Sequence, residues 1–147
     1  MKKFAFSLRP LLEMRERAEE EKQLALAARE RELQAAKDEL ARLNATFKSV
    51  SAALRDRHKD LGANELRAHY AHLQFMDRAM VMQHAVIANA QRMVDAARAE
   101  LMQASKDRKV IDTLRERRLS EHNELVAAEE QKELDDSNNR RFTRNMS

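Results

Sequence analysis

A seven-residue repeat of large apolar side chains runs through the first half of this chain without a break. Its members are Leu26, Leu33, Leu40, Phe47, Leu54 and Leu61, and a second row three residues further on includes Ala36, Leu43 and Val50. A helix with apolar residues at these two heptad positions buries a narrow stripe against another helix. The repeat therefore predicts one long coiled-coil helix over about residues 8–61.

A second series of the same kind follows the first. Its members are Leu66, Leu73, Met80, Ile87, Val94 and Leu101, with Met76, Ala90, Ala97 and Ala104 in the second row. It predicts a second helix over about residues 65–136. The only glycine, Gly62, lies between the two series, and a turn at residues 62–64 would fold the second helix back on the first. The predicted fold class is all-α, an antiparallel two-helix coiled-coil hairpin with the second helix longer, forming a single domain over residues 1–147.

Residues that favour helix ends stand at the predicted boundaries. Ser7 and Asn64 are expected to cap the two helices, because their side-chain oxygens can accept hydrogen bonds from free backbone N–H groups. Gly62 is expected to end the first helix in the left-handed conformation, which glycine adopts without a steric cost. Residues 137–147, which include Asn138 and Asn139, are expected to be a frayed tail.

The unequal lengths of the helices predict which residues pair. If the chain folds back at Gly62, Leu26 lies near residue 100 and Leu12 near residue 114. Leu119 follows Leu101 by two heptads plus four residues, a stutter that should relax the supercoil. Beyond about Leu119 the second helix would overhang, with three upstream apolar residues left to cover it: Phe4, Phe6 and Leu8.

Composition argues against a catalytic role. Charged residues make up 36% of the chain and aromatic residues 4%, which is typical of long exposed helices and not of a globular core. The chain has no cysteine, so disulfides and thiolate metal sites are excluded, and a single glycine cannot build a phosphate-binding loop. His69 and His72 are three residues apart, but partly exposed helical histidines are commoner than a metal site. We expect no enzyme activity, no cofactor and no metal.

Charge is distributed unevenly, although the formal net charge is only +3. Residues 106–118 carry six basic and three acidic side chains, whereas residues 129–136 carry a net charge of −4. The basic segment could bind phosphate or an acidic protein. It lacks the Phe and Tyr residues that nucleic-acid binders place among their basic side chains, so we expect no nucleic-acid partner. A nucleic-acid-binding hairpin and a generic dimerisation coiled coil remain the alternatives.

Two further features concern membranes and partners. The longest stretch without a charged residue, residues 79–91, is well below the roughly 20 residues needed to cross a bilayer, and a cytoplasmic protein is the simplest interpretation. Methionine is unbranched and repacks easily, so four methionines of the second helix either fill the seam or form an adaptable partner surface. They are Met76, Met80, Met82 and Met93.

Two segments of the chain have a distinctive residue pattern. The opening segment contains Phe4, Phe6, Leu8, Leu11, Leu12, Arg15 and Glu19 to Glu21. The segment near the end contains Arg108, Lys109, Leu114, Glu116, Arg117, Arg118, Glu129 and the run from Gln131 to Asp136. Together these segments resemble the FliJ family of flagellar type III export proteins, and the resemblance covers nearly the whole chain.

The resemblance implies a non-enzymatic rod of the export apparatus, similar in shape to the central stalk of rotary ATPases and located at the cytoplasmic face of the inner membrane through its partners. It implies binding to the hexameric export ATPase FliI and to the export gate protein FlhA, with FliH and export chaperones as further partners. In the family, gate contacts lie on the second helix just after the turn.

The positions that match those gate contacts are Leu73, Asp77, Met80 and His84. An apolar residue can occupy the position of Asp77 in the family. For the ATPase ring, we expect contacts from exposed basic side chains that can pair with carboxylates lining a pore. These are Arg108, Lys109, Arg115, Arg117 and Arg118.

Overall fold

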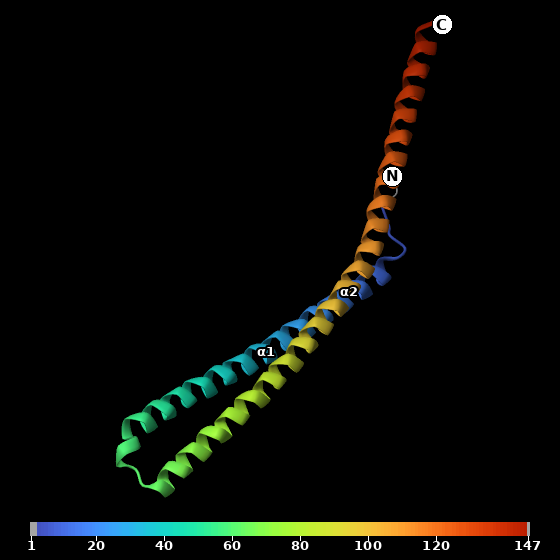
Figure 1. Cartoon of the computed structure of the whole chain (residues 1–147). Helices are drawn as coiled ribbons and strands as arrows, with labels where there is room; N and C mark the ends of the chain where they lie inside the picture. Colours follow the sequence, from blue (N-terminus) through green and yellow to red (C-terminus); the bar gives the residue numbers. More distant parts are fainter. Residues whose placement is uncertain (1–2, 147) are drawn as a thin grey trace. The chain divides into compact units, whose positions relative to one another are not determined.

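The computed structural model describes residues 3–146 and consists of two long helices joined by a short connection (Figure 1). Helix α1 spans Arg9–Arg57, the 3₁₀ helix η1 spans His58–Asp60, and helix α2 spans Ala63–Met146. The described residues contain no strand. The predicted all-α fold class, with the second helix longer than the first, is confirmed.

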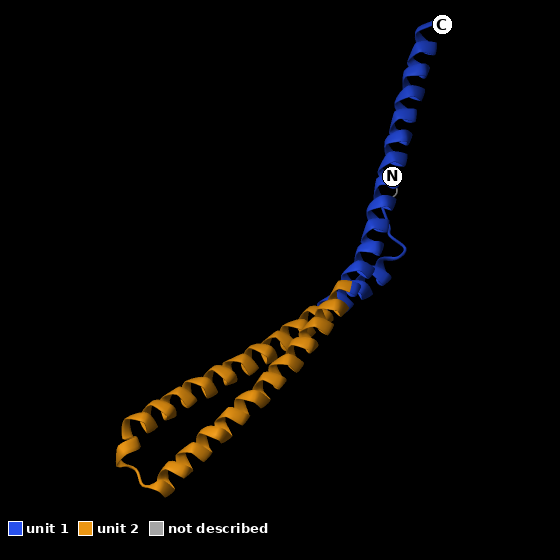
Figure 2. Cartoon of the chain, viewed as in Figure 1, with its two compact units in different colours: residues 1–20, 103–147 blue, residues 21–102 orange. Residues whose placement is uncertain are grey.

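The chain divides into two compact units, each with a part of both helices (Figure 2). Unit 2 comprises residues 21–102. Unit 1 combines the residues before 21 with those after 102, of which the structure describes 3–20 and 103–146. We keep the single domain over residues 1–147 as a proposal, because α1 and α2 are each continuous across the unit boundary.

Unit 2 is an antiparallel helical hairpin packed through the predicted seam. The most buried residues all belong to the two apolar series: Leu33, Ala36, Leu54, Met76, Val94 and Ala97. Val94 has no exposed surface, and the other large seam residues of the unit are half-buried. Fully burying a side chain of this size contributes roughly 1.5–3 kcal/mol, so the seam is the main source of stability here.

Two ion pairs report how α1 and α2 are aligned in unit 2. Lys22 Nζ lies 2.9 Å from Glu100 Oε2, and Arg98 Nη2 lies 3.7 Å from Glu30 Oε1. Leu26 lies midway between Lys22 and Glu30 in sequence, so these pairs agree with the prediction that it faces residue 100.

Gln83 is a polar residue at a seam position, three residues after Met80, and it is half-buried. Its Nε2 donates a 2.9 Å hydrogen bond to the carbonyl oxygen of Ala36 on α1. A shifted alignment of the helices would leave this amide without that partner. Such a polar seam residue favours one alignment over others.

The end of α1 differs from the prediction. The helix ends at Arg57, four residues before the predicted Leu61, and continues as the 3₁₀ turn η1. Leu61 is extended, with φ −97° and ψ 139°. The tighter turn and the extended residue redirect the chain before it reaches the glycine.

Gly62 consequently lies at the start of α2 instead of at the end of α1. Its carbonyl oxygen accepts a 3.0 Å hydrogen bond from the N–H of Leu66, which makes Gly62 the N-cap residue of α2. No residue from 3 to 146 has a positive φ, so the predicted left-handed glycine is wrong. The predicted cap at Asn64 is also wrong, because α2 already includes Asn64 in its first turn.

The two outer helix ends also depart from the prediction. Leu8, and not Ser7, precedes α1, since the Leu8 carbonyl accepts the N–H of Leu12 at 2.9 Å. At the other end α2 continues through Met146, so the predicted stop near Asp136 and the frayed tail are wrong for residues 137–146, and residue 147 lies outside the described residues. Neither Gly nor Pro occurs in this stretch, and Ser and Asn each cost a helix less than about 0.7 kcal/mol.

Candidate functional site

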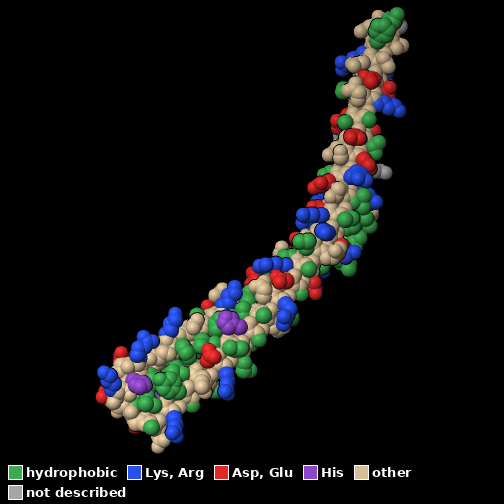
Figure 3. Space-filling view, viewed as in Figure 1, with side chains coloured by type: hydrophobic (Ala, Val, Ile, Leu, Met, Phe, Trp, Pro, Cys, Tyr) green, Lys and Arg blue, Asp and Glu red, His purple; other side chains and the backbone are tan. Residues whose placement is uncertain are grey.

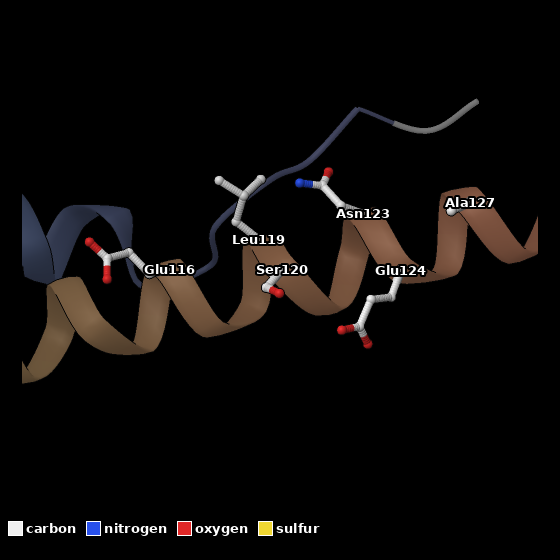
Figure 4. A pocket seen from close by; sticks show the side chains of 6 residues that line it. All are labelled: Glu116, Leu119, Ser120, Asn123, Glu124 and Ala127. Carbon is white, nitrogen blue, oxygen red and sulfur yellow. The ribbon is translucent and has the colours of Figure 1, made fainter.

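No enclosed site is evident at the depression bordered by residues 116–127 of α2 (Figure 4). All six side chains that border it come from this one stretch of helix. In Figure 4, Leu119 and Asn123 lie on one side of the helix and Glu124 on the other. Such an open surface does not exclude water from reacting groups. An open surface of this kind suits contact with a protein partner.

Two negative findings concern metals and membranes. Within residues 3–146, no three His, Asp or Glu side chains are close enough to hold a metal ion together. Nor does any helix in that range combine the length and the hydropathy of a membrane span.

The four residues matched to the gate contacts lie along α2 in unit 2. Leu73 and Met80 are half-buried seam residues, whereas Asp77 and His84 are exposed. Asp77 and His84 are seven residues apart and therefore share one face of the helix. The structure thus leaves two of the four side chains free for a partner and uses the other two to pack α2 on α1.

Arg108, expected to be exposed for the ATPase ring, is instead held inside unit 1. Its Nε lies 2.6 Å from Glu19 Oε2, its Nη1 lies 3.4 Å from Asp112 Oδ2, and only 25% of its side chain is exposed. The hydrogen bond that Arg108 donates to Glu19 is the main reason that the pKa of Arg108 is raised above its usual value. The expectation of a free guanidinium is wrong here, because Arg108 continues the seam row of Val94 and Leu101 and so faces α1.

Arg118 remains exposed, but it contacts a segment that we call the N-terminal strap, residues 3–8. Its Cζ lies 5.6 Å from the centre of the Phe6 ring, and its Nη1 donates a 3.0 Å hydrogen bond to Ser7 Oγ. One turn further along α2, His122 meets the ring of Phe4, with the ring centres 5.7 Å apart. The prediction that Phe4 and Phe6 cover this part of the second helix is confirmed. The hydroxyl of Ser7, predicted to cap α1, serves this contact instead.

Three of the five residues predicted to contact the ATPase ring are exposed cations without such intramolecular contacts. Lys109, Arg115 and Arg117 form no ion pair or side-chain hydrogen bond with any residue between 3 and 146. Their charges are available to carboxylates of a partner. A contact between any of the five residues and a ring stays a prediction.

The last part of α2 is a further candidate surface, which the positions of the basic residues do not indicate. Every residue from Ala127 to Met146 is exposed. Large apolar side chains occur in and just before this bare helix, at Leu125, Leu134 and Phe142. Leu125 and Leu134 are nine residues apart, which at about 100° per residue places them on opposite sides of the helix. A partner on one side could not cover both.

Comparison with known proteins gives one match. The family model described as flagellar FliJ protein matches residues 4–147. Searches of curated proteins and of solved structures returned no match. The matched range includes both segments of the sequence on which the resemblance rested.

Proposed function

The chain belongs to the FliJ family and is thus a component of flagellar protein export, and we propose that it acts as a stalk between the export ATPase FliI and the gate protein FlhA. In this role it performs no catalysis of its own. It promotes assembly and activity of the ATPase ring, at the cytoplasmic face of the inner membrane, and it reaches the membrane only through its partners. FliH and export chaperones are further partners in this proposal.

The observation that carries the proposal is the bare end of α2. Most of the stability of a helix in a protein comes from packing, and an unsupported helix of this length is marginal in water. Residues 127–146 have no such packing among the described residues, and the exposed Leu125 and Leu134 lie on opposite sides of the helix. A partner that surrounds the helix, such as the pore of a ring, would cover both of them.

Exposed cations beside this helix support the same partner. Lys109, Arg115 and Arg117 have no intramolecular partner among the described residues and can pair with pore carboxylates. Arg108 can pair with a pore carboxylate only if its ion pair with Glu19 breaks, and Arg118 only if its contacts with the N-terminal strap break. In unit 2, the exposed residues Asp77 and His84 are the proposed contacts to the gate, and Leu73 and Met80 hold α2 in place behind them.

The test is stimulation of the export ATPase by the full-length chain. We expect Leu134→Glu combined with Phe142→Glu to reduce the stimulation at least about tenfold, a change of 1.4 kcal/mol. The matched control is Ala41→Glu combined with Ala45→Glu, which adds the same charges to the exposed face of α1.

Both double variants should keep the helical content and melting temperature of the parent chain, because all four positions are exposed. Unaltered stimulation by the Leu134 and Phe142 variant would remove the end of α2 from the ring contact. Arg115→Glu with Arg117→Glu then tests the cations separately. For the gate, Asp77→Ala with His84→Ala should weaken binding to FlhA without changing stability.

A further inference from the structure

Unit 2 exposes a row of large apolar side chains on α2 that we call the apolar stripe. It consists of Phe75, Met82, Val86 and Met93, which are 68%, 71%, 51% and 37% exposed. Their spacings of seven, four and seven residues place them on one face of the helix. Hydrophobic side chains are visible over this unit in Figure 3, between those of Lys and Arg.

The stripe lacks the charges that normally cover the water-facing side of a coiled coil. Residues 79–91 contain no Asp, Glu, Lys or Arg on any side of α2. The other positions in the two heptad rows of the stripe, from Ala68 to Ala96, are alanines apart from His72 and Asn89. Small residues between large ones let another helix approach closely. Among the methionines with two open interpretations, Met82 and Met93 belong to this surface and Met76 is buried in the seam.

The stripe is separate from the proposed gate contacts. Val86 follows Asp77 by nine residues and His84 by two, which places it roughly 160–180° around α2 from both of them. Asp77 and His84 border one side of the seam with α1, and the stripe borders the other. A partner bound to the stripe would therefore leave the proposed gate contacts and the proposed ATPase contacts free.

The outer edge of the stripe carries unpaired positive charge. Arg78 lies one turn from both Phe75 and Met82, and it forms no hydrogen bond or ion pair within the described part of the chain. Arg92, two heptads further along the same edge, has one contact, a 3.5 Å hydrogen bond from its Nη2 to Asn89 Oδ1. The remaining residues of this heptad row between Ala71 and Ala99 are alanines, so the row itself contains no acidic residue.

We propose that the apolar stripe binds an amphipathic helix of another protein whose apolar face is bordered by Asp or Glu along one edge. The apolar side chains supply the buried surface, as in other complexes in which a helix docks by anchors spaced three and four residues apart. The two arginines select the acidic edge and set the direction of the bound helix.

A second copy of the chain fits this surface less well. Two copies packed antiparallel through the stripe would bring the outer edges together, with Arg78 of each copy close to Arg92 of the other. In a parallel pair, the outer edge of one copy would face the inner border of the other, where heptad position places Glu32 and Glu39. Those two carboxylates already pair with arginines of their own helix. Charge therefore favours a different partner.

Two synthetic helical peptides of equal length test the proposal against the full chain. Both carry the same leucine stripe, and one has Glu and the other Lys along one edge. Fluorescence anisotropy should show binding of the Glu peptide about tenfold tighter than that of the Lys peptide, or more. Arg78→Glu combined with Arg92→Glu should reverse this order of affinities. Met82→Glu should lower the affinity of the chain for the Glu peptide about tenfold. Phe75→Ser provides an independent second variant of the stripe.

Ala45→Glu on the exposed face of α1 is the matched control and should change neither affinity. Circular dichroism of every variant should match the parent, because none of the substituted positions is buried. The proposal is overturned if the two peptides bind with equal affinity. It is also overturned if neither Met82→Glu nor Phe75→Ser changes the affinity for the Glu peptide. A dimer of the free chain in sedimentation velocity that Met82→Glu dissociates would also overturn it, since the occupant would then be a second copy.

Discussion

Units 1 and 2 contain parts of the same two helices, yet different interactions hold each of them together. In unit 2 the apolar seam excludes water, and Val94 is completely buried. In unit 1, Leu12 is the one buried residue in the described range. The ion pairs Glu19–Arg108 and Arg15–Asp107 join the two helices, and contacts of Phe4 and Phe6 hold the strap on α2. Regions with few buried apolar contacts open at a lower free-energy cost. Unit 1 is therefore suited to exchange internal contacts for those of a partner, and unit 2 to remain folded.

The largest expected effect tests the seam of unit 2. Val94→Asp would place a carboxylate without a partner where no water reaches, which should lower the free energy of unfolding by about 3–5 kcal/mol. Urea unfolding followed by circular dichroism measures the loss. The control is Val81→Asp, the same substitution on the same helix at a side chain that is 64% exposed, which should cost less than about 0.5 kcal/mol. Equal losses would mean that α1 does not cover Val94.

An intermediate effect is expected when the N-terminal strap is released. Phe4→Ala combined with Phe6→Ala removes the ring contacts to His122 and Arg118, each worth about 1 kcal/mol. Hydrogen exchange should accelerate in α2 around residues 118–122, while amides near Val94 keep their protection. Leu24→Ala, at an exposed apolar position of unit 2, is the control and should leave both regions unchanged. Loss of protection near Val94 would contradict the separate stabilisation of the two units.

Sequence reasoning succeeded where one pattern repeats many times and failed where single contacts decide. Twelve heptad positions point to the same seam, so the hairpin and its alignment follow from the sequence even though each residue alone says little. The turn depends on a few backbone angles at Leu61 and Gly62, and a single glycine is compatible with either helix end. Arg108 was misjudged although it lies seven residues after Leu101 in the same seam row, because an arginine in the seam is taken for a surface residue until its partner Glu19 is located.

The helix ends and the stripe illustrate the same limit. Nothing in residues 137–146 is strong enough to predict a stop or to exclude one, so the predicted end near Asp136 depended on a weak preference. The positions of Phe4 and Phe6 could be predicted because the unequal helix lengths left them one place to pack. The apolar stripe was visible in the sequence as an uncharged stretch, but its exposure could not be told from burial until α1 was placed.

The smallest effect is expected from weakening one ion pair in each unit and comparing the resulting changes in hydrogen exchange. Glu19→Gln weakens the partner of Arg108 in unit 1, and Glu100→Gln does the same to Lys22 in unit 2. The side chain of Glu19 is 15% exposed and that of Glu100 is 59% exposed, so solvent screens the second pair far more. We expect the Glu19 variant to increase hydrogen exchange in α1 and α2 of unit 1 and the Glu100 variant to change almost nothing. Raising the salt concentration from about 0.1 M to 1 M, which shortens the Debye length from about 10 Å to about 3 Å, should weaken the Lys22–Glu100 pair more than the Glu19–Arg108 pair, because partly buried pairs are screened less. Were the two variants to behave alike at low salt, charge pairing would not distinguish the units, and the weaker hold on unit 1 would have to come from its lack of buried apolar side chains alone.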